Sequence, residues 1–167
     1  MNVLEFAINM ENDGEKYYRE QAELNRDNGL FVVCSMLADD EKNHAALLKS
    51  RYENRVFDLG EGSDVNRVGN VFSGLVDVGF YEKELLGQLD FYRLAANRER
   101  ESVVLYSEML EEAKVVREKE GSRDVLLFEF LIGQEEEHLR VLEELVKLLT
   151  HAEDWVENAE FGNREPY

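Results

Sequence analysis

Cysteine and proline are almost absent from this chain of 167 residues. The single cysteine, Cys34, has no second cysteine in the chain with which to form a disulfide, which fits a protein of the reducing cytoplasm. It lies in the apolar run 30–37, which predicts a buried, unreactive thiol. The single proline, Pro166, lies beside the C-terminus, so no proline interrupts the body of the chain. The length suits one domain over residues 1–167, and the lack of prolines favours long helices.

Basic residues are also scarce, because 19 lysines and arginines stand against 37 aspartates and glutamates, for a formal net charge of −18. Such a charge repels nucleic acid and anionic membranes, so we expect neither as a partner. The sequence has no apolar run long enough to span a membrane, and its first residues do not resemble a signal peptide. An acidic surface attracts cations such as ferrous iron, although acidity more often serves solubility alone.

Helical periodicity, by contrast, is abundant. Apolar and small residues recur at spacings of three and four over long stretches, as on one face of a helix. This pattern predicts helices at about residues 3–25, 30–54, 82–119 and 124–149, with a short C-terminal helix around Trp155. The polar residues 25–29 are expected to form the first turn, with Gly29 as a helix C-cap. Gly121 is expected to end the third helix.

Residues 56–80 are rich in glycine and have no sustained helical period, so we interpret them as a long connection. About 25 residues can span roughly 80 Å when extended, which is ample to run the length of a bundle. Two antiparallel hairpins joined by a long crossover are typical of ferritin-like bundles, since up-and-down bundles have only short loops. The predicted fold class is therefore all-α, a ferritin-like four-helix bundle.

Two of the three histidines stand three residues after a glutamate, in Glu41-Lys42-Asn43-His44 and Glu135-Glu136-Glu137-His138. Residues three apart share one face of a helix, so each pair can direct a carboxylate and an imidazole at a common point. That geometry suits a metal ion. A single motif of this kind in so acidic a chain is more often a solvated helix face, and the repetition is what favours a metal site.

Each of the other two long helices contains a glutamate that is followed by a small residue at plus three and a tyrosine at plus seven. The two series are Glu11, Gly14 and Tyr18, and Glu99, Ser102 and Tyr106. The small residues leave room beside a site, and the tyrosines lie two turns away on the same face. We expect the tyrosines to donate hydrogen bonds beside the carboxylates, although alone they would be ordinary core aromatics.

The register of the predicted hairpins tests this interpretation, because side chains on antiparallel helices meet only when they are equally far from the turn. The midpoint between Glu11 and Glu41 is residue 26, inside the predicted first turn. The midpoint between Glu99 and Glu135 is residue 117, within about one helical turn of Gly121. Both hairpins therefore bring the lone glutamate level with the Glu-x-x-His motif.

One glutamate from each of two helices and Glu-x-x-His from each of the other two form the ligand pattern of di-iron and di-manganese carboxylate proteins. The predicted ligands are Glu11, Glu41, His44, Glu99, Glu135 and His138. Four carboxylates balance the charge of two divalent ions, and the imidazoles complete their coordination. Iron is the expected metal, and manganese accepts the same ligands. The side chains expected at the surface are Glu15, Glu101, Glu136, Glu137 and His151.

The sequence resembles the rubrerythrin branch of the ferritin-like superfamily in its first two helices, at residues 10–18 (MENDGEKYY) and 40–45 (DEKNHA). The similarity extends over both hairpins and leaves the connection 56–80 unmatched. It implies a non-haem di-iron centre that reacts with peroxide or dioxygen. It further implies that Glu41 and Glu135 bridge the two ions, while the four other predicted ligands each bind one ion.

The chain departs from full-length rubrerythrins in two respects. A rubredoxin-like electron-transfer module needs paired Cys-x-x-Cys motifs, and the single cysteine cannot build it, so any electron donor must be an external protein. Typical rubrerythrins also have a further glutamate three residues after the ligand of the third helix, used when one iron shifts position. That place is Ser102 here, which puts the same iron-shifting peroxidase cycle in doubt.

Three functions are consistent with these features. The first is a di-iron oxidoreductase that reduces peroxide or dioxygen with electrons from an external donor. The second is a protein that oxidises, stores or hands on ferrous iron. The third is a sensor or structural metal clamp. By analogy with ferritin-like relatives we expect a homodimer or higher homo-oligomer in the cytoplasm, and the tail 155–167 has no assigned role.

Overall fold

The computed structural model describes residues 2–61, 87–116 and 121–161, which form four α-helices and no strand. The helices are α1 (Val3–Leu24), α2 (Leu30–Tyr52), α5 (Leu89–Val115) and α6 (Gly121–Phe161). The first two predicted helices are confirmed to within two residues at each end. The predicted third helix corresponds to α5, but residues 87 and 88 form a turn before it, and residues 82–86 and 117–119 lie outside the described ranges, as do residues 62–80 of the predicted connection. Gly121, which is expected to end the third helix, is instead the first residue of α6.

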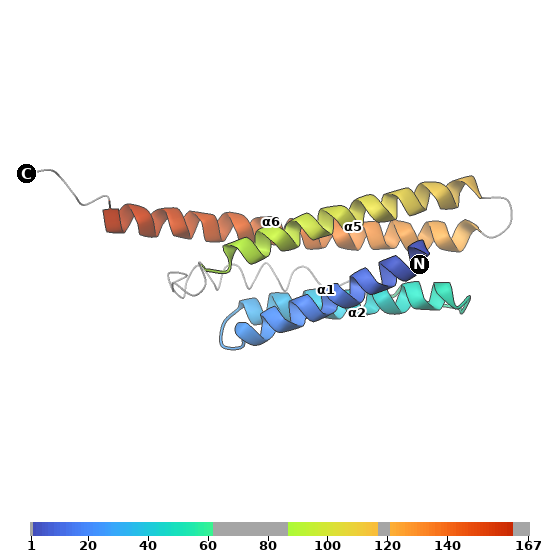
Figure 1. The fold of residues 1–167 in the computed structure, drawn as a ribbon, viewed down its shortest axis with the longest axis horizontal. Coiled ribbons are helices and arrows are strands. Elements are labelled where there is room, and N and C mark those ends of the chain that lie inside the picture. The colour runs from blue at the N-terminus through green and yellow to red at the C-terminus, as the bar shows by residue number, and fades with distance from the viewer. Residues whose placement is uncertain (1, 62–86, 117–120, 162–167) are drawn as a thin grey trace, which may run out of the picture.

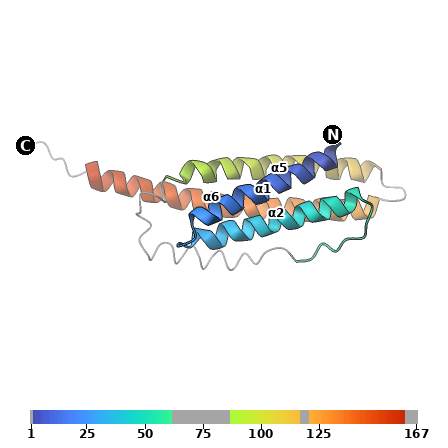
Figure 2. The same cartoon turned by 60° about the horizontal axis from the view of Figure 1, so that its bottom comes forward.

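The helices pair as two antiparallel hairpins, α1 with α2 and α5 with α6, and the hairpins lie side by side along their length (Figures 1 and 2). Between the hairpins, the backbones approach each other most closely along α2 and α6. This is the all-α four-helix bundle that the helical periodicity predicts. Its two hairpins place the predicted ligand-bearing stretches next to each other.

The first turn and the start of α5 close one end of the bundle through side-chain amides. Asn25 caps α1, and its Nδ2 donates to the carbonyl of Gln21 at 2.8 Å and to Oε1 of Gln88 at 2.9 Å. Gln88 returns a hydrogen bond from Nε2 to Oδ1 of Asn25 at 3.0 Å. The prediction that Gly29 is a C-cap is wrong, because Gly29 has a right-handed φ of −63° and precedes α2 as its N-cap. The asparagine supplies the polar groups that end the helix, so a left-handed glycine is not needed.

The apolar core is divided into two clusters along the bundle. One contains Leu37, Tyr92 and Leu145 among its members, and the other contains Leu48, Tyr106 and Leu131. Cys34 is buried in the first cluster as a free thiol, as predicted, with its sulfur 3.7 Å from the Tyr92 hydroxyl. Burial raises the pKa of this thiol to about 12, which keeps it protonated and unreactive.

The C-terminal segment is helical, as predicted, but it is the continuation of α6 rather than a separate short helix after Leu149. No glycine or proline stands between Leu149 and Phe161, so no residue there breaks the helix. Ala152 is buried, which extends the packed face of α6 beyond the predicted end. Figure 1 shows α6 running past the turn that joins α1 and α2.

None of the helices in the described residues is long and apolar enough to cross a membrane.

Candidate metal centre

The six predicted ligands converge in the interior, one glutamate each from α1 and α5 and one Glu-x-x-His pair each from α2 and α6. All six side chains are buried, and none is more than 4% exposed. They are Glu11, Glu41, His44, Glu99, Glu135 and His138. Charged side chains are rarely buried unless they are paired or bind a metal, so their convergence calls for a chemical reason.

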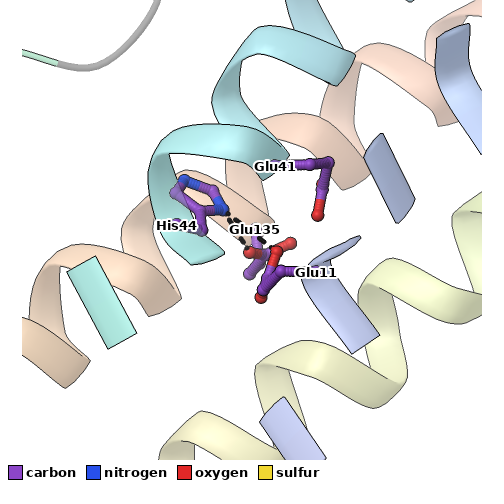
Figure 3. A group of neighbouring side chains, drawn as sticks. All are labelled: Glu11, Glu41, His44 and Glu135. Atoms are coloured by element: carbon purple, nitrogen blue, oxygen red, sulfur yellow. Dashed lines mark ion pairs between the residues drawn. The ribbon is translucent and has the colours of Figure 1, made fainter. Parts of the chain in front are cut away.

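The six residues form two overlapping groups, in each of which one ligand atom per residue lies within 4.8 Å of the others. The first group is Glu11, Glu41, His44 and Glu135, shown in Figure 3, and the second is Glu41, Glu99, Glu135 and His138. The carboxylates of Glu41 and Glu135 belong to both groups. The arrangement therefore has two four-residue groups that could each hold a metal ion and that share a pair of carboxylates.

Both histidines direct Nδ1 toward these carboxylates. His44 Nδ1 lies 3.0 Å from Glu135 Oε1 and 3.5 Å from Glu11 Oε2 (Figure 3). His138 Nδ1 lies 3.2 Å from Glu41 Oε1. The two imidazole rings lie side by side, with centroids 5.5 Å apart. The same nitrogen of each ring thus faces the space between the carboxylates.

The two tyrosines predicted beside the site cross from one hairpin to the other. Tyr18 of α1 donates its hydroxyl proton to Glu99 of α5, and Tyr106 of α5 donates to Glu11 of α1. Burial, together with the charges of the neighbouring glutamates, raises the pKa of both tyrosines well above the usual range. Both hydroxyls therefore remain protonated and can hold the outer carboxylates, those of Glu99 and Glu11, in place.

Asp40 is a residue of the site that the sequence reasoning missed. Its Oδ2 lies 3.1 Å from Nε2 of His138, across the interface between α2 and α6. With the proton on Nε2, the imidazole donates to Asp40 and its Nδ1 lone pair faces the glutamates. The available signal was its place next to Glu41, since adjacent helical residues point about 100° apart, toward different neighbours.

The four glutamates form two pairs whose pKa values are shifted in opposite directions. Burial raises the pKa of Glu41 and Glu135 well above the usual range, and the charge of Glu11 adds to both rises. Burial also acts to raise the pKa of Glu11 and Glu99, but donors around them outweigh it and lower both values. Burial acts to lower the pKa of His138, but Asp40 and Glu99 reverse this and raise it well above 6.5. Without a cation, the shared glutamates and His138 therefore hold protons.

The unpaired atoms of the cluster fit a pair of divalent cations. Among the described residues, every buried side-chain nitrogen or oxygen without a hydrogen-bond partner belongs to the six. These atoms are Glu11 Oε2, Glu41 Oε1, both Glu135 oxygens, both His44 nitrogens and His138 Nδ1. Leaving such groups buried and unpaired is costly, and the carboxylate oxygens and one nitrogen of each neutral imidazole have lone pairs suited to a metal. The chemistry of the donor set thus matches two hard or borderline divalent ions.

The other singled-out side chains lie where the sequence placed them. Glu101, Glu136 and His151 are exposed, and Glu15 is half-buried and within ion-pair distance of Arg19. Glu137 is half-buried and pairs with Arg140 on the outer face of α6. None of them is part of either four-residue group.

A four-helix bundle with four glutamates and two histidines in its core defines the class of ferritin-like carboxylate bundles. Within that class, the family model for rubrerythrin matches residues 2–146, which include all six buried residues. The chain belongs to the rubrerythrin family. The match ends within α6, before the last part of that helix. Searches of curated proteins and of solved structures found no match.

Proposed function

We propose that the six buried residues bind two divalent metal ions, with iron as the physiological metal. In this proposal Glu41 and Glu135 bridge the ions, Glu11 and His44 bind the first, and Glu99 and His138 bind the second. The observation that carries the proposal is the pair of overlapping four-residue groups with two carboxylates in common. Membership of the rubrerythrin family supports iron over manganese, which takes the same ligands.

We propose further that the protein is an oxidoreductase that reduces peroxide or dioxygen with electrons from an external donor protein. A bound di-iron pair supplies the electrons for such a reduction. The chain supplies the surroundings: the apolar clusters on both sides limit water, and Tyr18 and Tyr106 hold the outer carboxylates. Asp40 orients His138, so that its Nδ1 faces the shared carboxylates.

An iron-handling protein is the second candidate, one that oxidises ferrous ions and stores or releases them. Two features favour it. The net charge of −18 attracts cations, and Ser102 takes the place where typical rubrerythrins have a further glutamate. Such a protein uses iron as its substrate, whereas the oxidoreductase retains it through each turnover.

Stopped-flow mixing of the ferrous-loaded protein with peroxide separates these candidates. Rapid consumption of peroxide with two ions retained per chain is the expected result, and release or mineralisation of iron would favour the handling function. Glu41→Ala and His44→Ala should each lower the number of bound ions. Glu136→Ala and His151→Ala, which remove exposed residues of the same types, are the matched controls. Two ions bound by both site variants would refute the proposed site.

A further inference from the structure

A pocket of about 260 Å³ lies between α1 and α5 and reaches the buried cluster from outside. Its walls come from Met10, Asp13, Gly14 and Tyr17 of α1 and from Arg98, Glu101 and Ser102 of α5. Glu41, Glu99 and Tyr18 line it as well, and these three residues belong to the candidate metal centre. A water molecule in the liquid takes up about 30 Å³, so the pocket has room for a cation with part of its hydration shell.

The inner end of this pocket reaches a carboxylate whose Oε1 has no hydrogen-bond partner and lies 3.2 Å from Nδ1 of His138. This residue is Glu41, which lines the pocket and is 4% exposed. Gly14 lies directly beside it, because a Cβ atom at Gly14 would stand 2.8 Å from Glu41 Oε2. The missing side chain therefore leaves the approach to Glu41 open.

On the opposite wall, formed by α5, Ser102 has a small side chain that takes up little of the pocket. Its hydroxyl donates to the carbonyl oxygen of Arg98 at 3.1 Å, so the side chain is folded back on its own helix. The same hydroxyl is 3.7 Å from the sulfur of Met10, so the two walls of the pocket touch at this point. A larger residue at this place would project into the space between α1 and α5.

The outer end of the pocket is acidic. Asp13 and Glu101 are both exposed there, one on each wall. The single cationic side chain, Arg98, lies over the ring of Tyr17, with its guanidinium carbon 5.7 Å from the ring centroid. Carboxylates thus outnumber cations from the outer end to the inner end, and such a lining concentrates cations and repels anions.

Two other pockets among the described residues lack this connection. One of about 280 Å³ includes Arg51 and Asp124, and another of about 490 Å³ includes Arg93, Arg100 and Lys147. Neither of them is lined by any of the six candidate ligands.

We propose that the pocket between α1 and α5 is the passage through which divalent cations enter and leave the metal centre. Asp13 and Glu101 attract the ion at the outer end, and Glu41 is the first ligand that it meets inside. Gly14 and Ser102 keep the passage open. The inference rests on the proposed binding of two metal ions and adds the route by which they arrive.

The test measures the rate of Co²⁺ uptake by stopped-flow absorbance, the rate of Co²⁺ removal by a chelator, and the affinity at equilibrium. Ser102→Leu should slow uptake and removal together, each by about tenfold, because an obstruction raises the barrier without changing its two ends. The number of bound ions and the dissociation constant should stay the same. Ser107→Leu is the matched control, since the Ser107 hydroxyl also donates to a carbonyl four residues earlier, Val103, and the residue does not line the pocket.

The acidic outer end gives an independent test. The double variant Asp13→Asn with Glu101→Gln should take up Co²⁺ about threefold more slowly at low salt, and the difference should disappear in roughly 1 M salt, where charges are screened. The control is Glu20→Gln with Glu108→Gln, which removes the same charge from exposed positions on the same two helices, away from the pocket.

If Ser102→Leu binds two ions and takes up and loses Co²⁺ at wild-type rates, the proposed passage is wrong. If circular dichroism shows that Ser102→Leu does not fold, the double variant decides, and equal uptake by the double variant and its control at low salt would overturn the proposal. Failure of the proposed function has a different signature, since wild-type protein would then bind no pair of Co²⁺ ions at equilibrium.

Discussion

The two halves of the candidate centre have the same ligand types but different surroundings. In the half built on His138, Nε2 of the imidazole meets the Asp40 carboxylate at 3.1 Å. In the half built on His44, Nδ1 faces Glu135 at 3.0 Å, but Nε2 has no hydrogen-bond partner among the described residues, and the ring of Phe130 lies edge-on at 6.4 Å. The residue of α6 that corresponds to Asp40 is Gln134, which stands one position before Glu135.

This difference shows that repeated Glu-x-x-His motifs can lie in different surroundings. A carboxylate on the far nitrogen fixes the orientation of an imidazole and increases its basicity as a ligand. Asp40 therefore orients the far nitrogen of His138, whereas the far nitrogen of His44 has no such partner among the described residues. We expect the half with Asp40 to bind its ion more tightly, and the following predictions test how the two halves differ and what they share.

The largest effect should come from removing what the halves share. Glu135→Gln keeps the size of the side chain but replaces a carboxylate that belongs to both four-residue groups. We expect affinity for both ions to fall by more than about 100-fold, since metal ions of this kind require anionic oxygen ligands here. Calorimetric titration with Co²⁺ measures this loss. Glu136→Gln is the control, and one tightly bound ion remaining in Glu135→Gln would show that the carboxylate is not shared.

The pH dependence should come mainly from the shared carboxylates. Burial raises the pKa of Glu41 and Glu135, so without metal they hold protons to higher pH than an ordinary glutamate, whereas the pKa of Glu11 and Glu99 is lowered and these stay ionised. Metal binding must displace the protons, and affinity should rise by about tenfold per pH unit for each proton released. The rise should end once pH exceeds the raised pKa values.

The same shifts give the sign for stability without metal. A raised folded-state pKa contributes stability that is complete below the unfolded value, about 4.3 for glutamate, and is lost as pH rises through the folded value. Metal-free protein should therefore lose stability as pH increases above about 5, and metal should remove that loss. Calorimetric titration with Co²⁺ in buffers of different ionisation enthalpy counts the protons that are released when metal binds. Metal binding without proton release at any pH would contradict the assignment of protons to Glu41, Glu135 and His138.

A smaller effect should distinguish the halves directly. Asp40→Asn should lower the affinity for the ion at His138 by about 10- to 100-fold and leave the affinity for the ion at His44 nearly unchanged. A two-step Co²⁺ titration resolves the ions, and Asp39→Asn is the control, since Asp39 is exposed and pairs with Arg19. Gln134→Asp should act in the opposite sense by giving His44 a carboxylate. An equal loss of affinity for both ions in Asp40→Asn would show that Asp40 does not distinguish the two halves.

The sequence predicts the two halves well and their difference poorly. The spacing from Glu11 to Tyr18 and from Glu99 to Tyr106 is fixed by the geometry of a single helix, so the residues that meet across the bundle follow from register. The contact between Asp40 and His138 depends on how closely α2 and α6 approach, which no spacing within one helix specifies. The predicted helix end at Leu149 failed for a related reason, because no breaker stands there and packing at Ala152 carries the helix on.

The smallest expected effect concerns the two glycines that lie inside helices near the site. Gly14→Ala places a Cβ atom 2.8 Å from Glu41 Oε2, so the shared carboxylate must shift, and we expect both ions to bind about tenfold more weakly. At Gly133 of α6 a Cβ atom meets nothing within 4 Å in the part of the chain that the structure describes. Gly133→Ala should therefore leave metal binding unchanged and raise the free energy of unfolding by about 0.5–1 kcal/mol, the usual gain when alanine replaces glycine in a helix.

Comparing the two alanine variants separates the effect on helix stability from the effect on the site. Denaturant unfolding of the metal-free proteins gives the first, and Co²⁺ titration gives the second. Gly14→Ala gains the same helix propensity, so a metal-free Gly14→Ala that is no more stable than wild type would be explained by the displaced Glu41 alone. If Gly14→Ala instead binds both ions with wild-type affinity, Glu41 has room to yield, and the close approach of α1 to this carboxylate does not set the geometry of the centre.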